Sequence, residues 1–365
     1  MTASDVLVIG GGMAGISAAA LIAADASVTV IEREDALGHH ATGRSAAIFI
    51  RNYGNATLRA LNAASEPFFT DPGDVADAPL LSPRGELLLA GPGEMDRLEA
   101  YAEGGVGLER LSAAEAVALV PILRPERIEA ALHDPTASDM DVHHMLQGFA
   151  RLLRRRGGSI VTGAEAMAVE RSGGVWTVST PKGDHSAPIL VNAAGAWADR
   201  IAILAGVAPV GLVPKRRSIA VLPPPAGHAC DSWPVFGSAG ETWYAKPQSG
   251  KLLVSPADED PVEPHDAWPD DMVLAEGLHR FEEAVTVPVA RVESSWAGLR
   301  SFVADKTPVA GFAPDADGFF WLAGQGGYGI QTAPALATLA ADLCASRTPS
   351  LDPAVVAALD PGRFA

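Results

Sequence analysis

The chain lacks the residues that several classes of protein depend on. Only two cysteines, Cys230 and Cys344, occur in 365 residues, which excludes a disulfide framework, and neither belongs to a CxxC metal or redox motif. Basic residues are also scarce, since 27 Lys and Arg accompany 44 Asp and Glu, for a formal net charge of -17. Nucleic acid and anionic membranes repel such a chain as a whole. We therefore expect no nucleic-acid partner and a reducing, cytoplasmic location.

Long hydrophobic runs are missing as well. Residues 6–24 carry no charge, but three consecutive glycines interrupt this stretch, and no Lys or Arg precedes it. Its first part is β-branched and its last part is rich in alanine, which predicts a strand followed by a helix. We expect no integral membrane segment. Apolar residues are abundant, at 48% against 19% charged, and predict a large globular core.

The N-terminal residues predict a strand–turn–helix–strand unit. Residues 5–9 have the pattern of a buried parallel strand, residues 10–15 of a turn, and residues 16–24 of a helix. A second strand is expected over residues 27–31. This order of elements is typical of the first half of a dinucleotide-binding fold.

The turn and the end of the second strand carry a GxGxxG pattern and an acidic residue. Gly10 permits the tight turn, Gly12 lets the backbone approach a pyrophosphate, and Gly15 lets helix and strand pack closely. Glu32 ends the second strand, about twenty residues beyond the first glycine, where a carboxylate accepts hydrogen bonds from an adenosine ribose. The pattern predicts a bound dinucleotide and disfavours NADP.

Two further turns of small residues indicate that the dinucleotide is FAD. Residues 38–47 form a loop that continues from the ribose carboxylate, so its backbone amides and Arg44 are expected to reach along a longer cofactor. Residues 324–329 hold four glycines between a predicted strand, 319–323, and a predicted helix, 332–344. The N-terminus of that helix is expected to place a positive dipole beside the flavin.

Two histidine pairs are the only candidates for a metal site. In both pairs, His39–His40 and His143–His144, adjacent side chains are expected to diverge, and no carboxylate or cysteine cluster accompanies them. The sequence therefore predicts no metal.

Between the predicted parts of the nucleotide-binding unit, the pattern changes to short strands separated by Pro and Gly. We expect an α/β (α+β) fold in which a Rossmann-like FAD-binding domain of the glutathione-reductase type receives an inserted antiparallel-sheet substrate domain. The predicted FAD-binding domain comprises residues 1–78, 143–210 and 300–365, and the predicted substrate-binding domain comprises residues 79–142 and 211–299.

Longer blocks of sequence resemble a known family. The GxGxxG start, the Gly-Arg-Ser-Ala-Ala loop at 43–47, the block at 296–305 and the turn at 325–331 together resemble the D-amino acid oxidase (DAO) superfamily of FAD-dependent oxidoreductases. Within that superfamily the chain is most similar to bacterial D-arginine dehydrogenases, and the resemblance extends over nearly the whole chain. The motifs and the resemblance together imply non-covalent FAD in contact with Gly10, Gly12, Met13, Ala14, Gly15, Glu32, Arg33, Thr42, Gly43, Arg44, Ser45, Ala46, Ala47, Ala166, Ala194, Gly195, Gly326, Gly327, Tyr328, Gly329, Ile330 and Gln331.

The resemblance also implies a substrate pocket. In the family, arginines hold the substrate carboxylate, and a guanidinium can do so through two parallel hydrogen bonds. Tyrosine hydroxyls order the carboxylate or the amine, and a glutamate receives a cationic side chain. The matching positions of this chain are Arg217, Arg300, Tyr53, Tyr244, Glu86, Gly327 and Gln331.

One departure affects the predicted substrate. Where the dehydrogenase has histidine and tyrosine, this chain has Ile48 and Phe49, so an apolar group replaces a polar pocket group. This replacement is expected to weaken selection for polar substrates and to favour larger apolar ones. We expect an FAD-dependent D-amino acid dehydrogenase that oxidises D-arginine or other cationic D-amino acids and larger apolar ones. Hydride transfer to flavin N5 would give an imino acid, which hydrolyses to a 2-oxo acid and ammonia, and a quinone-like or other acceptor would take the electrons.

Two alternatives stay open. A related flavoprotein could oxidise glycine, sarcosine or an L-2-hydroxy acid on the same fold, since stereochemistry follows only from the resemblance. From a different class, an FAD-binding scaffold could pass electrons to a partner protein without oxidising a small molecule. The choice between oxygen and another electron acceptor also stays open.

Overall fold

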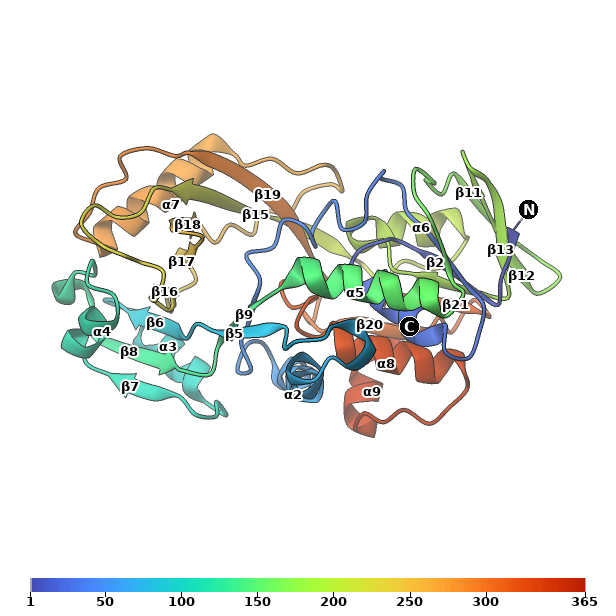
Figure 1. The fold of residues 1–365 in the computed structure, drawn as a ribbon, viewed down its shortest axis with the longest axis horizontal. Helices are drawn as coiled ribbons and strands as arrows, with labels where there is room; N and C mark the ends of the chain where they lie inside the picture. Colours follow the sequence, from blue (N-terminus) through green and yellow to red (C-terminus); the bar gives the residue numbers. More distant parts are fainter. Residues whose placement is uncertain (1, 365) are drawn as a thin grey trace.

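A computed structural model describes residues 2–364, with its two largest sheets at opposite ends of the molecule (Figure 1). The smaller of the two has six strands in the order β10-β3-β2-β14-β21-β20. All neighbours in it are parallel except β20 and β21. Its strands are β2 (Val6–Ile9), β3 (Val28–Ile31), β10 (Ser159–Val161), β14 (Ile189–Asn192), β20 (Val309–Phe312) and β21 (Phe319–Ala323).

Both faces of this sheet are covered, which is why its central strands are apolar throughout. Val6 and Val8 pack against the helices on one face, whereas Leu7 and Ile9 face a second, smaller sheet and α6 (Ala198–Leu204). The helices are α1 (Met13–Ile22), α5 (Val142–Arg155) and α8 (Ala333–Cys344), with α2 (Ala56–Thr70) and α9 (Pro353–Leu359) beyond α8. The smaller sheet contains β1 (Thr2–Ala3), β13 (Gly183–Ala187), β12 (Val175–Thr180) and β11 (Ala168–Ser172), in that order. The predicted Rossmann-like part is confirmed.

Helix α1 begins earlier than the sequence pattern indicated. Gly12 is extended, with φ -78° and ψ -178°, and the helix starts at Met13 rather than at residue 16. The second half of the predicted glycine turn is therefore the first turn of the helix.

The eight-stranded sheet lies at the other end of the molecule, in the order β19-β15-β18-β17-β16-β6-β8-β7. Its strands are β6 (Glu86–Ala90), β7 (Glu109–Leu111), β8 (Ala130–Asp134), β15 (Val213–Leu222), β16 (Val235–Ser238), β17 (Tyr244–Gln248), β18 (Lys251–Ser255) and β19 (Ser294–Phe302). The expectation of a purely antiparallel sheet is wrong at one place, since β6 and β16 are parallel. They lie far apart in the chain, so no hairpin constrains their direction.

Helices cover both faces of this sheet at its β6 side. Leu87 and Leu89 pack with α4 (Ala113–Leu119) and α7 (Asp271–Ala284), while Ala90 packs on α3 (Met95–Ala102). Because side chains alternate along a strand, Glu86 and Leu88 share the α3 side with Ala90. Four 3-10 helices complete the connections: η1 (Gly73–Val75), η2 (Pro125–Arg127), η3 (Gly195–Trp197) and η4 (Pro361–Phe364).

A three-stranded sheet lies between the two large ones in Figure 1. Its order is β4 (Ile48–Phe49), β9 (Ser138–Met140) and β5 (Leu81–Pro83). The division into two domains stays a prediction, and β19 runs unbroken through its boundary at 299/300. No helix within residues 2–364 combines the length and the apolar character needed to cross a membrane.

Candidate active site

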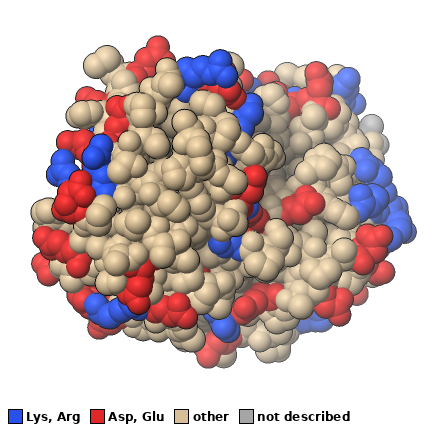
Figure 2. All heavy atoms as spheres, turned by 60° about the vertical axis from the view of Figure 1, so that its left-hand side comes forward, with Lys and Arg blue, Asp and Glu red and all other residues tan. Residues whose placement is uncertain are grey.

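A cavity of about 880 Å³ connects the two ends of the molecule, and the surface is visibly hollowed between them in Figure 2. It extends from the end of β3, past the N-terminus of α1, to the α3 side of the eight-stranded sheet. Every predicted cofactor and substrate residue lines it except Gly15 and Gly43. A Cβ on Gly15 would lie 2.0 Å from Gly10 O, and one on Gly43 would lie 2.5 Å from Gly38 O. These two glycines contact neighbouring backbone and not the cavity.

The glycine turn leaves room and hydrogen-bond donors at the N-terminus of α1. Gly10 has φ +113°, and a Cβ there would lie 2.3 Å from Ala193 O, so only glycine fits. A Cβ on Gly12 would meet only Thr42 Oγ1, at 3.4 Å. Within residues 2–364 no acceptor takes the amides of Gly12 and Ala14. Free amides at a helix N-terminus suit a pyrophosphate.

Glu32 occupies the end of β3 and is 8% exposed. Its Oε2 accepts a hydrogen bond from Gly11 N at 2.6 Å, and its Oε1 accepts one from Glu34 N at 2.9 Å. A carboxylate can accept about four hydrogen bonds, so two sites stay available at the cavity wall. The geometry fits an adenosine ribose, with the Gly11 bond fixing the carboxylate against the turn.

The contacts of Arg44 correct one expectation. Its guanidinium binds the carbonyls of Ala267 at 3.0 Å and Ala297 at 3.2 Å, and it also pairs with Asp266. The guanidinium therefore joins the loop at residues 38–47, called the cofactor loop, to residues 266–267 and 297. Arg44 also lines the cavity. Sequence analysis missed these partners because they lie more than 200 positions away in the chain.

Lys246 on β17 is a buried residue that sequence analysis also missed. Its side chain is 6% exposed, and Nζ donates to Ala46 O at 2.6 Å and Ala47 O at 2.9 Å and pairs with Asp139 at 2.9 Å. Burial lowers the Lys246 pKa, and the Asp139 charge opposes that shift. This lysine fixes the backbone of the cofactor loop from the substrate side.

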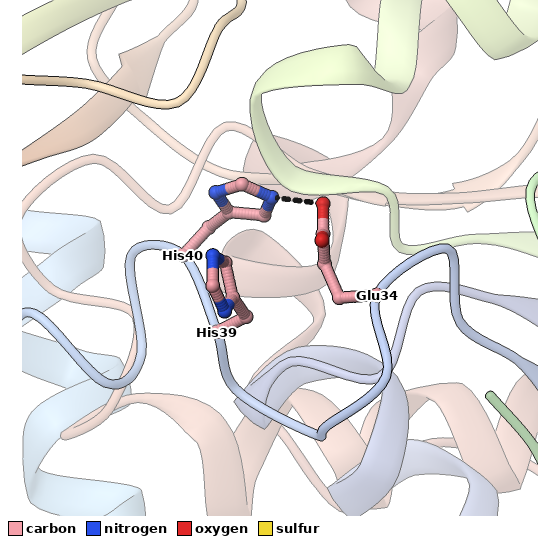
Figure 3. A group of neighbouring side chains, drawn as sticks. All are labelled: Glu34, His39 and His40. Carbon is pink, nitrogen blue, oxygen red and sulfur yellow. Dashed lines mark hydrogen bonds and ion pairs between the residues drawn. The ribbon is translucent and has the colours of Figure 1, made fainter. Parts of the chain in front are cut away.

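The side chains of the first histidine pair do not diverge as expected, and a carboxylate accompanies them. The rings of His39 and His40 lie 4.8 Å apart, and Glu34 accompanies them, so the possible ligand atoms of all three lie within 4.8 Å of one another (Figure 3). His40 Nε2 lies 2.8 Å from Glu34 Oε1, and the His40 ring packs at 4.6 Å from that of Trp197. The turn after β3 folds back on itself, which brings these side chains together.

Two arginines from adjacent strands form one end of the cavity. In the β15–β19 ladder Lys215 lies opposite Arg300 and Arg217 opposite Gly298, which places all three cations on one face. Arg217 is buried, and its Nε donates to Asp258 O at 2.9 Å while Nη2 pairs with Glu259 at 3.1 Å. Glu259 also accepts a hydrogen bond from Lys215 at 3.0 Å.

Arg300 differs from Arg217 because its guanidinium has no hydrogen bond or ion pair to any described residue. Tyr53, Tyr244 and Tyr328 line the same cavity. The turn at residues 324–329 passes so close that a Cβ on Gly327 would lie 2.9 Å from Arg300 Nη1. This half-buried guanidinium carries its charge at any physiological pH, so an anion from outside the chain would complete the site.

Gln331 fixes the segment that carries Tyr53. Its Oε1 accepts from Ile50 N at 3.1 Å, and its Nε2 donates to Ile50 O at 3.2 Å. The Tyr53 ring packs at 4.9 Å from that of Tyr328. The side-chain amide of Gln331 therefore holds the backbone of Ile50 at the cavity wall.

The departure at residues 48 and 49 concerns only one pocket position. Ile48 lines the cavity, whereas Phe49 is buried and packs 5.3 Å from Phe69. Successive strand residues point to opposite faces, so of the two only Ile48 is placed to contact a substrate.

Glu86 lines the cavity from β6, which four strands separate from β19 and Arg300, and this part of the cavity is called its acidic end. It is 8% exposed, and its Oε2 accepts a hydrogen bond from the Tyr101 hydroxyl at 2.7 Å. Burial raises the Glu86 pKa to about 7, and the charges of Asp134 and Glu241 add to that shift while the Tyr101 bond opposes it. The carboxylate is therefore costly to keep ionised in the absence of a cation.

This cost predicts that Glu86→Gln stabilises the apoprotein at alkaline pH. A carboxyl whose pKa rises on folding destabilises the folded state once the pH exceeds its unfolded value, and the penalty reaches its limit above the folded value. With a shift from 4.5 to about 7, glutamine should add roughly 3 kcal/mol to the free energy of unfolding at about pH 8 and little at about pH 4. Denaturant unfolding at both pH values measures the difference. An equal effect at both, or one matched by the exposed control Glu126→Gln, would contradict the assignment.

Comparison with known proteins agrees with this geometry. The family model described as FAD dependent oxidoreductase (DAO) matches residues 5–343. Glycine oxidase of Geobacillus kaustophilus is 26% identical over 255 residues, covering 68% of this chain and 65% of that protein. A crystal structure of glycine oxidase from the same species aligns with a TM-score of 0.83 at 21% identity, over 99% of this chain and 98% of that one.

Other relatives carry different names. Glycerol 3-phosphate dehydrogenase of Caloramator mitchellensis is 25% identical, over 93% of this chain and 73% of that protein. FAD-dependent oxidoreductase domain-containing protein 1 of Xenopus laevis is 27% identical over 42% of this chain, and the match spans only 34% of that protein.

Proposed function

The chain belongs to the DAO family of FAD-dependent oxidoreductases, and from that premise we propose that it is a D-amino acid dehydrogenase. We infer a preference for cationic D-amino acids, D-arginine among them, and for larger apolar ones. The observation that carries the proposal is Arg300, a guanidinium without a partner in the described chain that lines the cavity opposite a buried carboxyl group. An amino acid with a cationic side chain offers a partner to each end.

The balance of charge at the arginine end supports a carboxylate ligand. Lys215, Arg217 and Arg300 share one face, and among the described residues only Glu259 compensates them there. A substrate carboxylate would supply the missing negative charge, with Arg300 binding it through two parallel hydrogen bonds. Arg217 keeps Nη1 available for the same ligand.

The FAD family assignment fits the residues of the other half of the cavity. Glu32 would hold the ribose, the amides at Gly12 and Ala14 the pyrophosphate, and the turn at 326–331 the flavin end. When bound, FAD supplies the redox chemistry by accepting a hydride from the substrate α-carbon at N5. The chain's own residues position that carbon, since Arg300 and Arg217 fix the carboxylate and the Tyr53 and Tyr244 hydroxyls orient the amine.

The acidic end supports the side-chain preference. Glu86 would pair with an ammonium or guanidinium group, while Ile48, Ile50 and Leu88 line the same cavity and would contact apolar side chains.

The imino acid released after dehydrogenation would hydrolyse in water to a 2-oxo acid and ammonia. A quinone-like or other acceptor would take the electrons, and the scarcity of cysteine favours a cytoplasmic location.

The second candidate is oxidation of a smaller or differently charged substrate by the same site. The relatives named glycine oxidase and sarcosine dehydrogenase favour glycine or sarcosine, and the one named glycerol 3-phosphate dehydrogenase supports an anion bound at the arginine end. An L-2-hydroxy acid would use the same two arginines. None of these ligands would occupy Glu86, which is why the cationic amino acid is preferred.

A substrate panel tests the proposal. Purified holoenzyme with an artificial electron-accepting dye should reduce the dye with D-arginine, D-lysine and D-leucine and release the matching 2-oxo acid and ammonia in equal amounts. Their L-enantiomers should be inactive. Turnover confined to glycine, sarcosine, glycerol 3-phosphate or 2-hydroxy acids would reject the proposal in favour of the second candidate.

A further inference from the structure

We propose that Tyr101 is a positioning residue that sets the cation preference of the pocket by holding one oxygen of Glu86 and leaving the other for the substrate. The proposal rests on the proposed function, because it concerns the side-chain end of the same site. It depends on three features of the molecule: the attachment of α3, the single partner of Glu86, and the state of the neighbouring acids.

Helix α3 forms the wall that carries Tyr101. Leu98 packs on Ala90 and Leu132, while Tyr101 itself lines the cavity. The backbone at the end of this helix is held from α2, because Arg59 donates to Tyr101 O at 3.3 Å and Glu103 O at 2.8 Å. The position of the tyrosine ring is therefore set by packing on one side and by Arg59 on the other.

Glu86 has only this one side-chain partner. Its backbone is fixed by pairing with Asp134 on β8 and Val235 on β16, but within residues 2–364 only the Tyr101 hydroxyl donates to its carboxylate. That bond uses Oε2. The other oxygen, Oε1, accepts no hydrogen bond from the described chain, and it is not fully enclosed by protein. A donor for it would therefore come from the cavity.

The other acids near Glu86 do not offer an equivalent site. Asp134 is 1% exposed and already accepts hydrogen bonds from Asn52 Nδ2 at 2.8 Å and from the amide and hydroxyl of Thr136. Glu241, in the loop before β17, lines the cavity but is exposed. Tyr53, in the segment after β4, is the other titratable group near Glu86 and Tyr101. Glu86 is thus the buried carboxylate with a free oxygen at this end.

Loss of the hydroxyl should act through the charge of Glu86. The Tyr101 bond is the contact that opposes the burial-driven rise of the Glu86 pKa, so its removal raises that pKa further. At about pH 7 a larger fraction of Glu86 is then protonated, and a neutral carboxyl binds a cation weakly. Raising the pH ionises the group again and restores cation binding, which loss of packing alone would not do.

The experiment measures binding of two substrate-like acids that cannot be dehydrogenated at an amine. One is desamino-arginine, which is arginine without its α-amino group, and the other is hexanoate, which lacks the guanidinium. Titrations follow the absorbance of FAD in the holoenzyme, or heat, for the wild type, Tyr101→Phe and Glu86→Gln. Phenylalanine keeps the ring that packs in the wall, and hexanoate serves as the matched control ligand.

For Tyr101→Phe we expect desamino-arginine to bind roughly tenfold more weakly at about pH 7 and with nearly wild-type affinity at about pH 9, while hexanoate changes less than about twofold. For Glu86→Gln the loss should persist at both pH values. Equal weakening of both ligands, a loss that high pH does not reverse, or no preference of the wild type for the guanidino acid would each overturn the proposal.

The same data separate this proposal from the function on which it rests. If D-amino acids are not oxidised but the two ligands behave as expected, Tyr101 keeps its role and the proposed reaction fails. If D-arginine is oxidised but Tyr101→Phe binds both ligands normally, the reaction stands and the role of Tyr101 fails.

Discussion

Replacing Arg300 by methionine is expected to lower kcat/KM for D-arginine by roughly 10²–10³-fold. The guanidinium has no partner within the described chain, so its charge is available to the substrate carboxylate, and a two-bond ion pair in a buried site accounts for several kcal/mol. Methionine keeps the length and apolar stem of the side chain. Stability should fall little or even rise, because the removed cation is partly desolvated and has no ion-pair partner in the described chain.

Steady-state kinetics with an artificial electron acceptor measure this loss, and two further variants serve as controls. Arg300→Lys keeps the charge but not the planar pair of donors, so it should lie between methionine and the wild type. Arg291→Met removes an exposed arginine from the segment before β19 and should be neutral. A near-normal kcat/KM for Arg300→Met would show that the carboxylate binds elsewhere.

Replacing Gly12 by alanine is expected to weaken FAD binding by roughly a hundredfold while the apoprotein stays as stable as the wild type. Gly12 has an ordinary φ of -78°, and the added Cβ would meet only Thr42 Oγ1 at 3.4 Å, so the fold accepts it. The methyl group would keep the pyrophosphate from the free amides at the start of α1. Loss of two charge-assisted hydrogen bonds costs about 3 kcal/mol.

Gly183→Ala is the matched control, because Gly183 has φ +104° but an added Cβ would meet no atom within 4 Å. It should cost stability, by about 1 kcal/mol, and leave FAD affinity unchanged. Fluorescence titration of apoprotein with FAD and thermal unfolding of each variant give both quantities. Normal FAD affinity in Gly12→Ala would contradict the placement of the pyrophosphate.

The parts of the fold that the sequence predicted correctly are those determined by neighbours in the chain. Residues 319–323 are a strand as expected, and the helix expected over residues 332–344 is α8, Ala333–Cys344. The position of Glu32 beside the glycine turn follows from one strand, one turn and one helix. Each of these depends on local periodicity, capping or turn chemistry, which a sequence records directly.

The parts that were missed depend on contacts between distant segments. Arg44 reaches carbonyls of Ala267 and Ala297, and Lys246 holds the backbone of Ala46 and Ala47, across about 200 residues of chain or more. The parallel pairing of β6 with β16 has the same origin. No local pattern specifies such partners, because each residue type also has an ordinary surface or strand role.

The substrate site shows the same limit. Family resemblance identifies Arg217, Arg300 and Glu86 as substrate-binding candidates. The structure shows that Arg217 and Glu86 have side-chain partners, Glu259 and Tyr101. Tyr101 gave no signal in the sequence, since a single tyrosine in an amphipathic helix is usually a packing residue. Its contact with Glu86 depends on how α3 crosses the sheet.

The most direct test of the proposed reaction is to mix the FAD-loaded protein with D-arginine under anaerobic conditions and follow the visible absorbance of the flavin. We expect rapid loss of the oxidised flavin band with D-arginine and D-leucine, none with L-arginine, and a rate reduced by roughly 10²–10³-fold in Arg300→Met. A flavin that stays oxidised with every D-amino acid but is reduced by glycine, sarcosine, glycerol 3-phosphate or a 2-hydroxy acid would contradict it.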